Sequence, residues 1–136
     1  MQKEVRMMKA LIIKSGLQSN KTIISEEAVR KMYSEHNEGK PLFNDMRSKE
    51  SSLCGYLNRT ELFRNKETGE LEMWGYFTYM YNGIDFSKDG KCSCKIAYSG
   101  NTNKNTVLHN CSLVCCTMIN EAGDIDGKPY VETYSE

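Results

Sequence analysis

Four cysteines have a spacing that would suit a metal ion. If their segments form strands, Cys92 and Cys94 share one face, as do Cys111 and Cys115, because side chains alternate along a strand. Four thiolates gathered in this way would match tetrahedral Zn²⁺. The usual C-x-x-C pairs are absent, and a cysteine often serves as a small buried apolar residue. We therefore expect no metal, and a zinc-stabilised structural domain remains an alternative.

Groups for acid–base catalysis are scarce, because the chain has only two histidines. His36 falls at the expected end of a helix, where a solvated cap is the simpler interpretation. His109 falls in an expected strand and could act as the base for a serine or cysteine nucleophile. No glycine-rich phosphate loop, H-E-x-x-H or G-x-S-x-G motif accompanies them. The residues alone complete no catalytic site and imply no cofactor.

An aromatic group could anchor a partner. Trp74, Tyr76, Tyr79 and Tyr81 fall within one segment, as Phe77 also does. Such side chains stack on nucleic-acid bases, bind proteins or fill a core. The 18 basic and 18 acidic side chains cancel, so the chain lacks the positive charge typical of phosphate binding. This balance favours a protein partner over direct nucleic-acid contact, with those four residues as the expected binding residues.

Length and composition indicate one globular domain over residues 1–136. Hydrophobic residues make up 39% of the chain and charged residues 26%. Residues 1–14 lack the pattern of a signal peptide, and no apolar run reaches the roughly 20 residues that span a bilayer. We therefore expect a cytoplasmic protein without membrane contact, with its six cysteines reduced.

Local patterns place one helix and several strands. Ser25 is a typical N-cap, and the apolar stripe that follows predicts a helix over about residues 26–36. The stripe is formed by Ala28, Val29, Met32 and Tyr33. Before the helix, residues 1–8 are expected to form a flexible arm and residues 9–13 a first strand.

The rest of the chain is rich in strand signals. Residues 53–63 and 70–80 flank a turn-forming segment and predict a β-hairpin. Two further strands are expected over residues 92–98 and 107–119, and the tail, residues 120–136, is expected to add an edge strand. Together these elements predict an α+β, β-rich fold: an antiparallel barrel or curled sheet with the helix packed on it.

Seven short segments, taken in order, form a pattern: residues 24–29 (ISEEAV), 39–42 (GKPL), 54–57 (CGYL), 69–72 (GELE), 92–96 (CSCKI), 111–114 (CSLV) and 120–122 (NEA). This pattern resembles the phage prohead (capsid maturation) protease family. The resemblance spans about residues 9–123 and implies a small β-barrel with flanking helices and a serine–histidine site, similar to herpesvirus assemblins.

The resemblance also implies where catalytic residues would stand. Ser93 matches the family's serine, and Asp124 or Asp126 would be a third member. The family's histidine falls between residues 42 and 53, an interval that contains no histidine here. A serine hydroxyl without a base is a poor nucleophile. We expect no catalytic residues; if the chain is active, the set is Ser93, His109 and Asp124.

These observations favour a non-catalytic phage or prophage binding protein built on a protease-like barrel. It would act by protein–protein contact, as an inhibitor of a host defence enzyme such as a CRISPR effector (an anti-CRISPR). The first alternative is a capsid maturation serine protease or a head-assembly factor that binds capsid or scaffold proteins. The second is the zinc-stabilised domain. The sequence leaves homo-oligomerisation open.

Overall fold

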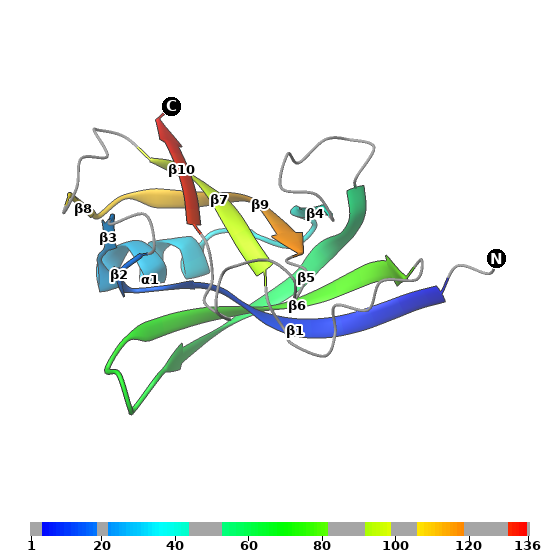
Figure 1. Cartoon of the computed structure of the whole chain (residues 1–136), viewed down its shortest axis with the longest axis horizontal. Helices are drawn as coiled ribbons and strands as arrows, with labels where there is room; N and C mark the ends of the chain where they lie inside the picture. The colour runs from blue at the N-terminus through cyan, green and yellow to red at the C-terminus, as the bar shows by residue number, and fades with distance from the viewer. Residues whose placement is uncertain are drawn as a thin grey trace.

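The structure is a computed structural model, which describes residues 4–18, 22–43, 53–81, 92–98, 106–118 and 131–135. One helix and ten strands occupy these residues (Figure 1). They are β1 (Glu4–Lys14), β2 (Gly16–Leu17), β3 (Ile23–Ile24), α1 (Glu26–Ser34), β4 (Pro41–Phe43), β5 (Leu53–Arg64), β6 (Leu71–Tyr81), β7 (Cys92–Tyr98), β8 (Val107–Leu108), β9 (Cys111–Met118) and β10 (Val131–Ser135).

Seven of these strands form one curled sheet in the order β1-β6-β5-β4-β9-β7-β10. The expected α+β fold, a curled sheet with one main helix, is confirmed. The sheet does not close into a barrel, and its strand directions are mixed, because β4 runs parallel to β9 and β7 parallel to β10. These partners are distant in sequence, so no tight hairpin turn forces them to be antiparallel. A small second sheet has the order β2-β3-β8.

The helix begins where the sequence predicts. The Ser25 side chain accepts a hydrogen bond from the Ala28 N–H at 3.0 Å, which satisfies one free donor of the first turn. The helix ends at Ser34, two residues before the expected end. Asn37 explains the early end, because its Nδ2 donates to the Met32 carbonyl at 2.7 Å, in place of the backbone donor that a longer helix would provide.

The core lies between α1 and the inner face of the curled sheet. Ala28, Val29 and Met32 are fully buried there, whereas Tyr33, the fourth residue of the expected stripe, is exposed. The β6 residues on the inner face are buried as their alternation predicts. These are Leu71, Met73, Phe77 and Tyr79.

The hairpin and the late strands match their predicted positions closely. β5 and β6 pair antiparallel on either side of the turn at residues 65–69, and β7 covers residues 92–98. The single strand expected over residues 107–119 is instead two strands, β8 and β9, separated by His109 and Asn110. The edge strand expected in the tail is β10, the last strand of the large sheet.

The first strand is longer than expected. From Glu4 onward, the segment expected to be a flexible arm pairs with β6, with Glu4 opposite Tyr81 and Met8 opposite Phe77. Met8 is buried, so this pairing adds apolar contact as well as backbone hydrogen bonds. At a bulge in β1, the Leu11 carbonyl accepts a hydrogen bond from the Cys92 thiol at 3.2 Å. This bond joins β1 to β7 across the curl.

The fold predicts that a larger side chain at Gly75 would displace the buried side chains around it. A Cβ atom there would lie 2.6 Å from Cδ1 of Ile12 and 2.8 Å from Cδ1 of Leu57, closer than van der Waals contact allows. We expect Gly75→Ala to lower the free energy of unfolding by about 1–3 kcal/mol, the usual cost of an overfilled core. Urea denaturation would measure the change.

The control for this measurement is Lys66→Ala, in the exposed turn of the hairpin. It should change the free energy of unfolding by less than about 0.5 kcal/mol. Equal denaturation midpoints for Gly75→Ala and the unchanged protein would contradict the close packing of β1, β5 and β6.

Candidate functional site

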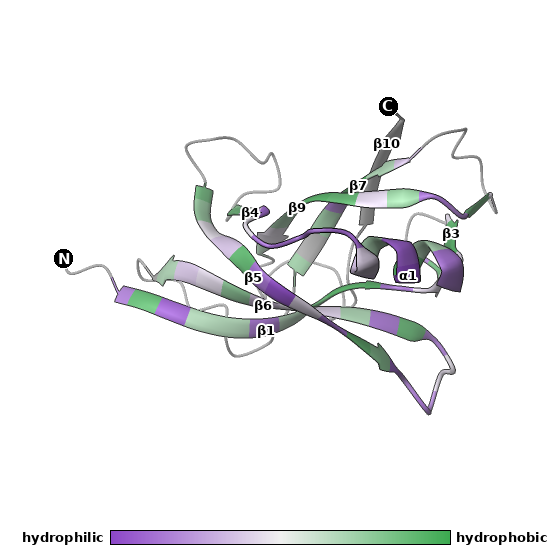
Figure 2. Ribbon diagram, turned by 180° about the vertical axis from the view of Figure 1, so that it is seen from behind, coloured by the Kyte–Doolittle hydropathy of each residue, from purple (hydrophilic) through white to green (hydrophobic). Residues whose placement is uncertain are grey.

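The outer face of β1, β6 and β5, which points away from the core, carries an unusual concentration of apolar side chains. Nine large hydrophobic residues are exposed in the part of the chain that the structure describes, and five of them lie on this face. Figure 2 shows hydrophilic and hydrophobic bands alternating along β1. Clusters of exposed apolar residues mark interaction surfaces more often than scattered ones do. The five are Val5, Met7, Tyr56, Phe63 and Met80.

Tyr76 stands at the centre of the outer face between two cations. The register places Lys9 of β1 and Arg59 of β5 on either side of it. The Lys9 ammonium is 5.3 Å from the centre of the Tyr76 ring, and the Arg59 guanidinium is 3.8 Å from it. Each distance is within the range of a cation–π interaction. The Tyr76 hydroxyl also donates to Glu61 at 2.7 Å, so the ring is held at both its face and its end.

Trp74 is fixed in a similar way. Its Nε1 donates to the Glu72 carboxylate at 2.9 Å, and Lys9 lies 5.5 Å from the centre of its ring. Glu72 is itself buried and also accepts from Asn65 at 3.2 Å. Both aromatic side chains are therefore half-exposed but held in one orientation by polar neighbours.

Glu61 remains charged over the whole physiological range. The hydrogen bond from the Tyr76 hydroxyl, followed by the positive charges of Lys9 and Arg59, lowers the pKa of its carboxyl group. Glu61 lies 3.9 Å from the Lys9 ammonium and 3.8 Å from the Arg59 guanidinium, so its negative charge offsets one of the two positive charges around Tyr76.

The structure separates the four expected binding residues. Trp74 and Tyr76 lie together on the outer face, whereas Tyr79 is buried in the core at 2% exposure and presents no binding surface. Tyr81 ends β6, and its side chain lies outside the described residues. Sequence reasoning missed Lys9 and Arg59. The hairpin register would have placed Arg59 opposite Tyr76 only if the bulge in β5 had been known.

The structure does not bring Ser93 and His109 together. Ser93 pairs with Thr117 near one end of β9, whereas His109 precedes Cys111 at the other end. The strand from Cys111 to Thr117 spans about 20 Å, far more than the reach of a hydrogen bond. His109 is exposed, with its Nδ1 3.8 Å from Glu27 of α1. Ser93 and His109 therefore do not form a nucleophile–base pair in this structure, and Asp124 lies outside the described residues.

The four cysteines of the zinc alternative do not converge either. Cys94 pairs with Cys116 across β7 and β9, whereas Cys111 pairs with Tyr98 at the far end of the same ladder. Among the described residues, which include all six cysteines, no group of three potential ligands could hold a metal ion. A hydrogen bond with Cys92, followed by burial, raises the pKa of Cys116 well above its usual value. Cys92 and Cys115 are buried too, so these thiols behave as core residues.

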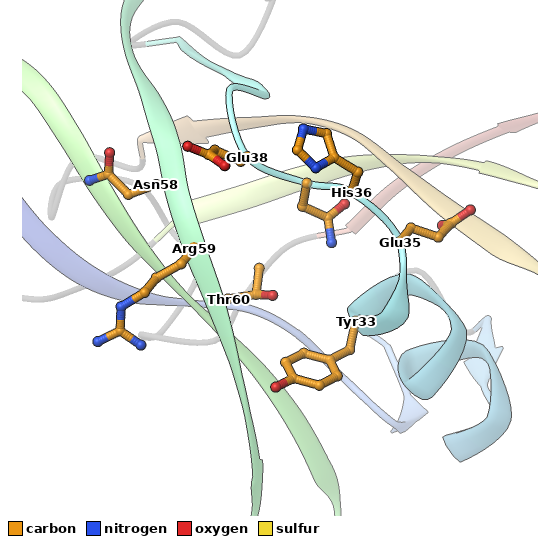
Figure 3. Close-up of a pocket in the computed structure, with 8 residues that line it drawn as sticks. Tyr33, Glu35, His36, Glu38, Asn58, Arg59 and Thr60 are labelled. Carbon is orange, nitrogen blue, oxygen red and sulfur yellow. The ribbon is translucent and has the colours of Figure 1, made fainter.

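A small cleft of about 350 Å³ lies between the C-terminal end of α1 and β5 (Figure 3). Figure 3 shows Tyr33 of α1 and Thr60 of β5 facing one another across it, while Arg59 points away from the helix. Sequence reasoning did not find this cleft, because its two walls come from separate segments, residues 33–38 and 58–60. It is lined by Tyr33, Glu35, His36, Asn37, Glu38, Asn58, Arg59 and Thr60.

No family model, curated protein or solved structure matches this chain. In the described part of the chain, no helix is long and apolar enough to cross a membrane.

The burial of the thiols predicts slow alkylation of the native protein. Burial raises the pKa of both Cys54 and Cys111 to about 11. At pH 8 about 0.1% of such a thiol is the reactive thiolate, compared with about 10% at an ordinary pKa of 9. We expect iodoacetamide to modify the folded protein slowly, starting at half-buried Cys54, and all six cysteines only after unfolding.

Intact-mass spectrometry over time would count the modified thiols, and the Cys54→Ser variant identifies the first one. Rapid modification of two or more cysteines in the native state would contradict the burial of the β7–β9 thiols.

Proposed function

We propose that this chain is a non-catalytic binding protein that recognises a protein partner through the outer face of β1, β6 and β5. The central observation is the pair Trp74 and Tyr76, half-exposed and held in place by Lys9, Arg59 and Glu61. Trp, Tyr and Arg are the residues that most often dominate the binding energy of protein interfaces.

The rigidity of the pair supports this proposal. Binding costs less side-chain entropy when an anchor is already held in its bound orientation. The apolar residues around the pair, such as Met7, Tyr56 and Phe63, would exclude water from the contact. Tyr76 is less suited to stacking on a nucleic-acid base, because Lys9 and Arg59 already occupy positions over its ring.

The class of partner follows from the sequence resemblance to phage prohead proteases. That resemblance implies a protease-like frame, and the lack of a histidine between residues 42 and 53 suits a phage protein that has a binding role. We propose a host defence enzyme, such as a CRISPR effector, as the partner. A head-assembly role, with capsid or scaffold protein as the partner, is the alternative. The separation of Ser93 from His109 supports a role that does not depend on this pair.

The first experiment is affinity capture of the tagged protein from host lysate, followed by the same capture with Tyr76→Ala and Trp74→Ala. We expect a stoichiometric defence enzyme with the unchanged protein. Each substitution should weaken binding by about 2 kcal/mol or more, as truncation of an interface anchor does. Affinity measured with the purified partner would give the value.

The control is Leu17→Ala, a more exposed apolar residue in the small sheet, away from the outer face, which should bind normally. Circular dichroism would show whether each variant is folded. Normal binding by folded Trp74→Ala and Tyr76→Ala would exclude the outer face. Capture of capsid or scaffold proteins would favour the head-assembly role, and a dimer in light scattering would identify a second copy as the occupant.

A further inference from the structure

Strand β1 forms one edge of the large sheet in the described structure. The sheet order places β6 on one side of it, and no described strand pairs with its other side. Figure 1 shows β1 at the margin of the sheet, with its N-terminal end far from α1. Near Leu11 this margin is taken by β7, whose Cys92 thiol bonds to the Leu11 carbonyl. The open edge therefore runs from Glu4 to Ala10, and such an edge is a template for another extended chain.

The backbone groups of Val5 and Met7 point toward this open edge. Leu57 of β5 turns both its N–H and its C=O toward β4, where both are hydrogen-bonded. Phe77 lies opposite Leu57, so it turns its own groups to the other side, toward Met8 of β1. Because these directions alternate along a strand, Val5 and Met7 turn their N–H and C=O groups away from β6.

The open edge lacks the devices that usually prevent strands from pairing. Such devices are a proline, a bulge or a lysine that projects from the edge. This edge contains no proline, and its pairing with β6 is regular as far as Leu11. Its lysine, Lys9, lies over the aromatic rings of the outer face. Val5 and Met7, at 63% and 68% exposure, are the most exposed large hydrophobic residues of the described structure.

The charges on this edge are self-complementary about Val5. Glu4 and Arg6 flank Val5 and project from the face opposite to its side chain. If two copies of β1 pair antiparallel around a twofold axis at Val5, each Glu4 lies directly opposite the other copy's Arg6. An axis at Arg6 would place two guanidinium groups opposite each other, and an axis at Met7 would form no ion pair. Arg6 already bonds to Glu4 of its own strand at 2.8 Å, and its five N–H donors allow a second carboxylate.

We propose that β1 pairs antiparallel with β1 of a second copy of this chain, around a twofold axis at Val5, so that two large sheets join edge to edge. The two Val5 residues exchange two backbone hydrogen bonds, and two Glu4–Arg6 ion pairs form on one face. On the other face, Val5, Met7 and Met80 of both copies come together and remove apolar surface from water.

This dimer does not depend on the partner proposed above. It joins two strand edges and leaves Trp74 and Tyr76 exposed on the outer face, although it covers part of Val5 and Met7 there. A contact between two short edges is smaller than a standard protein interface, and contacts of that size give weak complexes. We therefore expect dimers only at high protein concentration.

Sedimentation velocity of the full chain, from about 10 µM to 1 mM, tests this expectation, and the mass should rise from monomer to dimer. Val5→Pro should weaken dimerisation at least about tenfold, because proline lacks the N–H that the second copy bonds. The fold should persist, since β6 does not use that N–H. Val5→Thr keeps the N–H and a similar shape, so it is the matched control and should dimerise normally. Circular dichroism would show that each variant is folded.

Charge reversal tests the register. Glu4→Lys and Arg6→Glu should each remain monomeric, because like charges then meet at both ion pairs. An equimolar mixture of the two variants should form a heterodimer, because each pair again joins opposite charges. A role confined to the ion pair within one strand would predict no such rescue on mixing.

Four outcomes would overturn the proposal. The first is a monomer at all concentrations up to about 1 mM. The second is a dimer that Val5→Pro leaves unchanged, and the third is the absence of a heterodimer on mixing. The fourth is the loss of the dimer in folded Trp74→Ala or Tyr76→Ala, which would place the second copy on the outer face instead.

Discussion

The structure depends on the shortness of β4. Among the described residues, this strand of three residues is the only strand that links the β1-β6-β5 group to the β9-β7-β10 group in the large sheet. A sheet joined at so narrow a point can bend there without breaking many backbone hydrogen bonds. The curl of the sheet brings the Cys92 thiol of β7 within hydrogen-bond distance of the Leu11 carbonyl of β1. Helix α1 lies beside the gap left by β4, held to β9 by Lys31 and to β5 by the Arg64–Glu26 pair.

The two candidate surfaces follow from this bend. The curl buries one face of β6 around Phe77 and leaves the opposite face, with Trp74 and Tyr76, without a covering layer in the described structure. The same short strand pairs with β5 only as far as Tyr56, and beyond Leu57 a cleft, and no strand of the described residues, lies beside β5. The shortness of β4 therefore accounts for both the exposed outer face and the cleft beside β5.

The pairing of β7 with β9 separates most of the residues for which the sequence suggested catalytic or metal-binding chemistry. The β7–β9 register places buried thiols in the core and sets Ser93 far from His109. What remains concentrated is a set of fixed aromatic and charged side chains around Tyr76, supported by neighbours on both adjacent strands. These side chains hold one another in fixed orientations, which supports the proposed role of this face in recognition.

The sequence by itself determined the local elements. The Ser25 cap, the hairpin around residues 65–69 and the alternation of β6 were predictable because each depends on neighbours a few residues away. Only the tertiary structure decided which face of β6 is covered, and therefore that Tyr79 lies in the core and Tyr76 at the surface. The distance from Ser93 to His109 and the cleft beside Thr60 were also undetermined, because both arise from pairing between strands distant in sequence, which no local pattern encodes.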